Sequence, residues 1–336
     1  MNGQEVMTTE RPSGGGGLTP ALSRAATSLV GNYGTILLLA ALFVIFSLTN
    51  SYFLTLSNLQ NVLLTQTIVG AMALGVMFPL IVGEFDLSVG YMIGFVCMVG
   101  AWLGGHGWSG LPTILVMLAV GVVIGFLNGI LTERLHISSF IATLGVGIVL
   151  EGLTDGLSNG QVLSTGIPSI MKTIGENYAG PLAVSVWVTI VLAVILFYIL
   201  EQTPAGRSWY AIGGSERVSF LAGLRTRRYK VAAFMISGLL VSCGAIFALG
   251  QNGSASPSFG SDLLLPAYAA AFLGVTTYRG GRYNVVGTIV GLLLLGIGFN
   301  GLSLYGVPFW VQPVFNGAVL LVAVLVARSE RRHVLR

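Results

Sequence analysis

Few residues in this chain could perform covalent chemistry. Residues 156–160 have the sequence G-L-S-N-G, which fits the G-x-S-x-G pattern of serine hydrolases. That nucleophile must follow a strand of an α/β sheet, whereas this copy follows a long apolar segment. The three histidines form no H-E-x-x-H zinc motif. We therefore expect no metal site and no enzymatic activity, and a hydrolase that uses Ser158 is a remote alternative.

The lysines exclude one common route to nucleotide hydrolysis. A P-loop, G-x-x-x-x-G-K-[ST], needs a lysine after a glycine, because this lysine and the backbone amides bind the nucleotide phosphates. Here Lys172 follows a methionine and Lys230 follows a tyrosine. We expect no cofactor on this chain, so any ATP and Mg²⁺ must be used by a partner, or an ion gradient must supply the energy.

Acidic side chains beside apolar segments are the remaining candidates, because a charge inside a membrane is costly and usually functional. Glu84 and Asp86 lie between two apolar segments. The Asp86 carboxylate can accept the amide of Ser88 or Val89 and so cap the following helix, or it can take part in gating or substrate contact. Glu84 either lines the mouth of a pathway or faces the cytoplasm.

The composition indicates that membrane helices position these residues. Only 8% of the 336 residues are charged and 54% are hydrophobic, whereas about 25% of a soluble domain is charged. A helix needs ~20 mostly apolar residues to cross a bilayer. The sequence predicts an all-α membrane fold with spans near residues 32–50, 62–82, 88–104, 111–131, 138–156, 182–200, 229–250, 262–277, 284–302 and 306–327.

The basic residues support this count and give an orientation. With the N-terminus in the cytoplasm and ten alternating helices, all of the 16 basic residues except Lys172 lie inside, as the positive-inside bias predicts. We therefore expect a multi-pass protein of the cell membrane with both termini in the cytoplasm. Residues 1–30 form a flexible tail, residues 31–328 the membrane domain and residues 329–336 a basic tail.

The longest inside loop, residues 201–230, contains a short predicted helix. Ser215 is a suitable N-cap, and Val218, Leu221 and Ala222 share one face. The glycine pair at 213–214 would allow a tight turn into this helix. A short amphipathic helix on a basic loop is suited to dock in a groove of another protein, and the alternative is a helix at the lipid interface.

Three segments resemble the sugar-transporting ABC permeases of the ribose, xylose and galactose type. Residues 211–214 (A-I-G-G) and 222–224 (A-G-L) resemble their coupling-loop motif. Residues 84–90 (E-F-D-L-S-V-G) resemble G-x-I-D-L-S-V-G, and residues 280–302 resemble a C-terminal pattern that ends in N-G-L. Glu84, Phe85 and Ser215 depart from these motifs, and the change at Glu84 leaves the substrate open.

This resemblance, over residues 32–327, implies a permease subunit that imports a monosaccharide or similar polyol by alternating access. ATP-binding subunits would supply the energy, an extracytoplasmic binding protein would deliver the solute, and a second permease, expected as a homodimer, would complete a pathway within membrane lipid. No nucleic-acid partner is expected. The residues implied in contact with the ATP-binding subunit are Ala211, Gly213, Gly214, Ser215, Glu216, Val218, Leu221, Ala222 and Gly223.

An ion-gradient-coupled secondary transporter is the alternative. It would need carboxylates inside the membrane, and the four candidates, Glu84, Asp86, Glu151 and Asp155, all lie near the ends of predicted spans.

Polar and glycine residues inside the spans give further candidates. Polar groups could line a pathway or join helices by hydrogen bonds; the pathway or gating candidates are Glu84, Asp86, Ser88, Gln66, Asn128, Thr143, Asn300 and Trp310. Close helix packing is expected at Gly121, Gly125, Gly129, Gly287 and Gly291. The similar sequences at 125–129 (G-F-L-N-G) and 298–301 (G-F-N-G) would fit an inverted repeat, although chance is the stronger explanation because glycine and phenylalanine are common in this chain. Cys97 and Cys243 lie in apolar runs and are expected to pack there.

Overall fold

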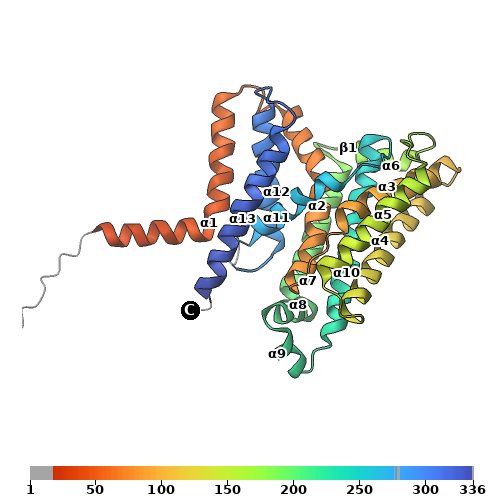
Figure 1. Cartoon of the computed structure of the whole chain (residues 1–336). Coiled ribbons are helices and arrows are strands. Elements are labelled where there is room, and N and C mark those ends of the chain that lie inside the picture. The colour runs from red at the N-terminus through yellow and green to blue at the C-terminus, as the bar shows by residue number, and fades with distance from the viewer. Residues whose placement is uncertain (1–17, 276, 278–280, 335–336) are drawn as a thin grey trace, which may run out of the picture.

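The computed structural model describes residues 18–275, 277 and 281–334, which are almost entirely helical (Figure 1). The elements in order are α1 (Leu18–Thr49), α2 (Leu56–Ile81), α3 (Val89–Gly105), α4 (Gly110–Glu133), α5 (Ser139–Ser158), α6 (Ser169–Gly175), β1 (Tyr178–Ala179), β2 (Leu182–Ala183), α7 (Val184–Gln202), α8 (Pro204–Gly214), α9 (Glu216–Leu221), α10 (Thr226–Asn252), the 3-10 turn η1 (Ser261–Leu263), α11 (Leu264–Gly274), α12 (Val285–Ser303) and α13 (Val311–Val334). The two strands form one antiparallel hairpin.

The helices agree with the ten predicted spans. Among the described residues, six helices are long and apolar enough to cross a membrane, namely α2, α4, α5, α7, α10 and α12. Four shorter apolar helical segments, at Gly34–Thr49, Val89–Gly105, Ser261–Gly274 and Val311–Val324, match the other four predicted spans. The predicted all-α polytopic fold is confirmed.

The ends of three predicted segments differ from the structure. The span predicted at 262–277 is helical as α11 over only eleven residues, about 16 Å long at 1.5 Å per residue, which is shorter than a ~30 Å hydrocarbon core. Helix α1 begins at Leu18, so the second part of the predicted tail of residues 1–30 is helical, while residues 1–17 lie outside the described residues. Helix α13 continues to Val334, which makes most of the predicted C-terminal tail helical.

The short helices α3 and α11 cross inside the molecule. Leu264, the first residue of α11, lies 3.0 Å from the position that a Cβ atom would take on Gly90 in α3, and a Cβ atom on Gly94 would overlap the Phe259 carbonyl. From this crossing α3 continues to the loop at Gly166, and α11 runs the other way to the start of α12 at Gly287. The two helices therefore start at a common depth and leave it in opposite directions, which is a geometry typical of membrane transporters with broken helices.

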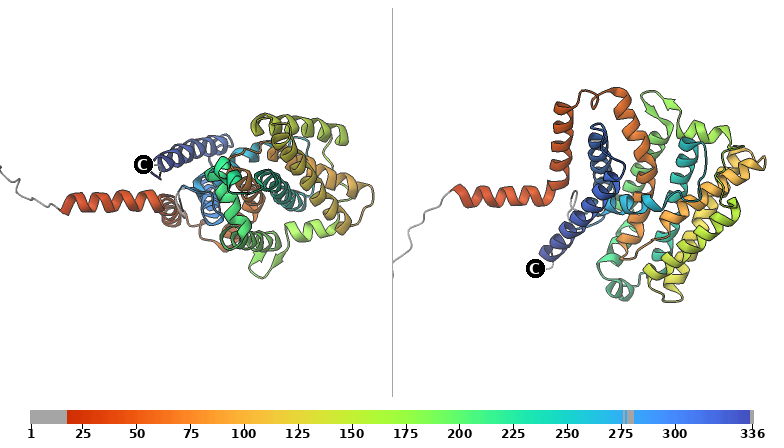
Figure 2. Two further views of the ribbon diagram at one scale, coloured as in Figure 1. Left: turned by 90° about the horizontal axis from the view of Figure 1, so that it is seen from below. Right: turned by 45° about the horizontal axis from the view of Figure 1, so that its top comes forward.

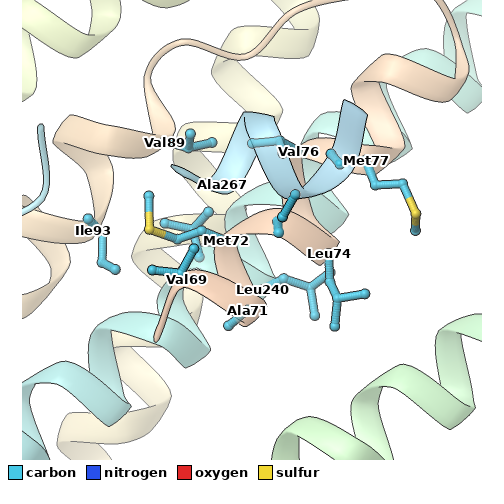
Figure 3. Packing of buried hydrophobic residues seen from close by; sticks show 14 of the residues in the cluster. Val69, Ala71, Met72, Leu74, Val76, Met77, Val89, Ile93, Leu240 and Ala267 are labelled. Atoms are coloured by element: carbon cyan, nitrogen blue, oxygen red, sulfur yellow. The ribbon is translucent and has the colours of Figure 1, made fainter. Parts of the chain in front are cut away.

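Helix α2 forms the centre of the core (Figure 3). Its residues from 67 to 81 are all buried, since α3, α7, α10, α11 and α12 surround it. Val69, Met72 and Val76 pack among Ile93 of α3, Leu240 of α10 and Ala267 of α11. A helix that is apolar all round is either enclosed by other helices in this way or surrounded by lipid.

The glycines predicted to pack helices lie at close contacts. Gly121 and Gly125 of α4 press on α10, where added Cβ atoms would overlap the carbonyls of Gly238 and Phe234. Gly129 of α4 lies against Val231 of α10. In α12, Gly287 and Gly291 press in the same way on Gly274 and Ala270 of α11. Side chains at these positions would push the helix backbones apart.

The bundle has two distinct ends. Helices α8 and α9 form one end, the α9 face, while α6 and the β1–β2 hairpin form the other, the α6 face (Figure 1). Helices α1, α12 and α13 gather at one side of the molecule and α3, α4 and α5 at the other (Figures 1 and 2). The last turn of α2 reaches the α9 face, because Ile81 contacts Gly213 of α8.

Candidate functional site

The two short helices of the α9 face are set by local capping. Thr203 accepts the Gly206 amide at 3.3 Å to start α8, with Pro204 in the first turn. Ser215 accepts the Val218 amide at 3.4 Å to start α9, as its predicted N-cap role requires. Gly223 then ends this segment with φ +87°, a left-handed conformation that favours glycine.

The glycine pair before α9 has a different role from the one predicted. Gly213 and Gly214 lie in the last turn of α8, and neither has positive φ, so they do not form a tight turn. A Cβ atom on Gly213 would overlap the Ile81 carbonyl, whereas one on Gly214 would meet nothing within 4 Å. Gly213 therefore allows α8 to lie directly on the end of α2.

Helix α9 presents apolar side chains that contact little of the chain. Val218, Phe220 and Leu221 are 64%, 67% and 76% exposed, whereas Ser219 is buried. Ala211 and Ala222 are also exposed. A cluster of large apolar groups at the end of a protein is typical of an interaction site.

Lys230 connects α9 with the bundle. Its Nζ lies 2.7 Å from Glu216 Oε2 of α9, 2.8 Å from Glu84 Oε1 of the α2–α3 loop, and 3.0 Å from Glu133 Oε1 of α4. The side chains of Lys230 and Glu133 are only 7% and 8% exposed. A buried cation held by three carboxylates has few other stable positions, so Lys230 ties α9 to the α2–α3 loop.

This cluster lines a large cavity of the α9 face. The cavity has a volume of about 1280 Å³ and lies between α9, the α4–α5 loop and the start of α10. Arg217, Arg225, Arg227 and Arg228 line it together with the four charged groups of the Lys230 cluster. Among the described residues, no group of three histidine, cysteine, aspartate or glutamate side chains could hold a metal ion.

The next residues of the α2–α3 loop form a second, fully buried polar cluster. The Asp86 carboxylate accepts Ser88 Oγ at 2.6 Å, Ser237 Oγ at 3.0 Å and the Ser88 amide at 3.3 Å. Asn128 Nδ2 donates to Asp86 Oδ1 at 3.3 Å and to Ser88 Oγ at 2.8 Å. Three of these four hydrogen bonds go to Oδ1 and one goes to Oδ2, so the carboxylate joins the α2–α3 loop to α4 and α10.

Neighbouring backbone groups fix this loop to two more helices. The Phe85 amide donates to Ser139 Oγ at 3.1 Å and the Leu87 amide to Thr143 Oγ1 at 2.9 Å, both on α5. The Asp86 amide donates to the Tyr268 hydroxyl of α11 at 2.9 Å. Since Glu84 belongs to the same loop, a continuous set of polar contacts joins α9 to α5, α10 and α11.

The other predicted pathway residues are spread over the molecule. Asn300 exchanges hydrogen bonds of 2.9 and 3.0 Å with Asn58, which joins α12 to α2. Trp310 is 56% exposed near the start of α13. Gln66 lines a separate cavity between α2, α11, α12 and α13. A role for these residues in a pathway stays a prediction.

Several residues of the two polar clusters and of the α9 surface were not predicted from the sequence. Lys230 and Glu133 lie 97 positions apart along the chain, and no local spacing could pair them. Ser237 and Tyr268 have ordinary positions in apolar segments. Phe220 could have been predicted as part of the exposed apolar surface, because it lies beside Val218 and Leu221 in the predicted short helix. It was missed because it does not follow their i, i+3 spacing.

Comparisons with known proteins agree with this architecture. Residues 58–324 match the family described as "Branched-chain amino acid transport system / permease component". The ribose import permease of Escherichia coli is 33% identical over 328 residues, 97% of this chain and 100% of that protein. The ribose import permease of Bacillus subtilis is 36% identical over 302 residues, 88% of this chain and 92% of that protein. The L-arabinose ABC transporter permease of Azospirillum brasilense is 31% identical over 323 residues, 96% and 95% of the two chains.

Proposed function

Because the chain belongs to the family of branched-chain amino acid transport system permease components, we propose that it is the membrane-spanning subunit of an ATP-driven importer for a monosaccharide. Its similar relatives are import permeases for ribose and an ABC transporter permease for L-arabinose. The chain is a transport subunit and not an enzyme. ATP and Mg²⁺ are used by separate ATP-binding subunits.

The observation that carries the proposal is the combination of an exposed apolar helix with a buried ionic connection. Val218, Phe220 and Leu221 offer a surface for a partner, and Glu216 of the same helix is held 2.7 Å from Lys230. An ATP-binding subunit that moves α9 would therefore act on the α2–α3 loop. That loop leads into α3, one of the two helices that cross inside the molecule.

The proposal assigns a side to each end of the bundle. The α9 face lies in the cytoplasm with both termini, as the distribution of basic residues favours. The α6 face lies outside and receives the binding protein. The exposed apolar side chains of α4, α5 and α7 face lipid or a second permease subunit, and a homodimer gives each ATP-binding subunit its own α9.

A substitution on α9 tests the docking surface. Replacing Leu221 by Asp puts a charge into an apolar contact, so the amount of ATP-binding subunit that co-purifies with the permease should fall at least about tenfold. The variant should remain folded because this side chain is 76% exposed. Val218→Asp should act in the same way.

The matched control is Leu54→Asp, a 51% exposed leucine in the α1–α2 turn away from α9, which should keep the partner bound. If Leu221→Asp and Val218→Asp bind the ATP-binding subunit as well as the unchanged chain does, then α9 is not the docking site. A helix that only rests on the lipid interface would give that result.

A further inference from the structure

A second cavity, of about 410 Å³, is lined by residues of α2, η1, α11 and α12 and by the start of α13. It shares no lining residue with the cavity of the α9 face. Its volume falls within the range of small-molecule sites, roughly 300–1,000 Å³. Its lining combines the side chains of Gln66, Asp262, Gln312 and Asn316 with the rings of Phe299 and Phe309.

The polar groups of this cavity are available to a ligand. Within the part of the chain that the structure describes, the side chains of Gln66, Asp262, Gln312 and Asn316 have no hydrogen-bond partner. The amides each offer donors and an acceptor, and the carboxylate offers only acceptors. Such a mixed set matches hydroxyl groups, which both donate and accept.

The backbone of α12 makes room for one of these groups. A Cβ atom on Gly296 would lie 2.6 Å from Gln66 Cγ and 2.7 Å from Gln66 Cδ, so Gln66 lies flat against the glycine. Phe299 follows one turn later on the same helix, and Phe309 is 91% exposed beside it in the cavity wall. Ring faces can stack on the polarised C–H groups of a sugar.

The lining of the cavity is apolar on the side of the α9 face. Along α2, Val69 is nearer to that face than Gln66, and along α12, Leu295 is nearer than Phe299. Pro266 is likewise nearer than Asp262 along α11, and all three apolar residues are buried. The polar groups and the rings therefore lie on the side of the α6 face, which is the side from which a solute would enter.

The charges of the lining select among solutes. Among the described residues, the wall of this cavity has no lysine, arginine or histidine, so a phosphate ester or the carboxylate of an amino acid would find no cation there. The N-terminal end of η1–α11 could attract an anion, but Asp262 already occupies that first turn. A neutral polyol fits this charge pattern and an anion does not.

We propose that this cavity is a monosaccharide-binding site that faces outward, with Gln66, Asp262, Gln312 and Asn316 as hydrogen-bonding groups and Phe299 and Phe309 as stacking surfaces. The site rests on the proposed transport function and specifies where that solute binds. The site lies beside the start of α11 inside the molecule. Transporters with broken helices hold their substrates at such positions.

Thiol labelling tests the site without using transport. In the full chain in lipid nanodiscs, Asn316→Cys should react with a maleimide, and D-ribose, L-arabinose or D-xylose at millimolar concentration should slow that reaction at least about threefold. L-leucine and ribose 5-phosphate should not slow it. Asn61→Cys, on an exposed position of α2 outside this cavity, is the matched control and should react equally with and without sugar.

Uptake by the complete transporter gives a second readout. Gln66→Leu should raise the KM for the transported sugar about tenfold, while Asn61→Leu should leave it unchanged, and both should keep the ATP-binding subunit bound. The site is wrong if no sugar protects Asn316→Cys, if leucine or the phosphate ester protects it, or if Gln66→Leu transports normally. Those results would leave the docking of an ATP-binding subunit at α9 standing, because that is measured separately.

Discussion

At the scale of single residues, Lys230 joins three separate parts of the chain by ion pairs. It is the shared partner of Glu84, Glu133 and Glu216, which come from a loop, a long helix and α9. Two of the four side chains, those of Lys230 and Glu133, are almost completely buried. A buried pair of this kind adds little to stability by itself but fixes the relative positions of the parts that carry it.

Replacing Lys230 by Met should destabilise the protein by about 3–5 kcal/mol, because it leaves buried carboxylates without their cation. Midpoint temperatures of unfolding in detergent would measure the change. Lys172→Met, at an exposed position of α6, is the matched control and should leave the midpoint unchanged. Equal midpoints for the two variants would contradict the structural role of Lys230.

At the scale of elements, close helix contacts hold the bundle together. The α4–α10 contact depends on glycine in both helices, since Gly121 and Gly238 each face the other's carbonyl group. Side chains at these positions would push the backbones of the two helices apart.

Gly125→Ala should destabilise the protein by about 1–3 kcal/mol through overpacking, because its Cβ atom would overlap the Phe234 carbonyl. Gly145→Ala in α5 is the control, since a Cβ atom there meets nothing within 4 Å, and it should be neutral or stabilising. Unfolding midpoints of the two purified variants provide the comparison, and a stable Gly125→Ala protein would show that α4 and α10 are less tightly packed than described.

The lengths of the apolar segments were sufficient to predict where the membrane helices lie. They did not predict the exact length of each helix or the contacts between distant residues. The spans match because hydropathy is a local property of each segment. The span predicted at 262–277 was the shortest of the ten, and the structure shortens it further, because Ser261–Leu263 form a 3-10 turn and the α-helix covers only Leu264–Gly274. The cluster around Lys230 was not predicted either, because Glu84 and Lys230 are 146 positions apart and meet only after the bundle has formed.

At the scale of the whole molecule, the two ends differ in what they present. The α9 face carries the exposed apolar helix and a cavity lined by charged groups. The other cavity is lined by amide side chains, the Asp262 carboxylate and two aromatic rings. This division suits a subunit that receives energy at one end and a solute at the other.

The proposed sidedness can be tested with a membrane-impermeant maleimide in right-side-out vesicles. Tyr178→Cys, on the α6 face, should react in intact vesicles because that side chain is 50% exposed. Val218→Cys on α9 should react only after the membrane is made permeable. The reverse pattern would place α9 outside and would exclude docking of a cytoplasmic ATP-binding subunit there.

The most direct test of the central claim is uptake of D-ribose, L-arabinose and D-xylose into proteoliposomes that contain the permease with its ATP-binding subunit and binding protein. Uptake of at least one sugar should require ATP on the side of α9 and should continue when ionophores collapse all ion gradients. Uptake that proceeds without ATP, or that stops when the gradients collapse, would contradict the function as an ATP-driven permease.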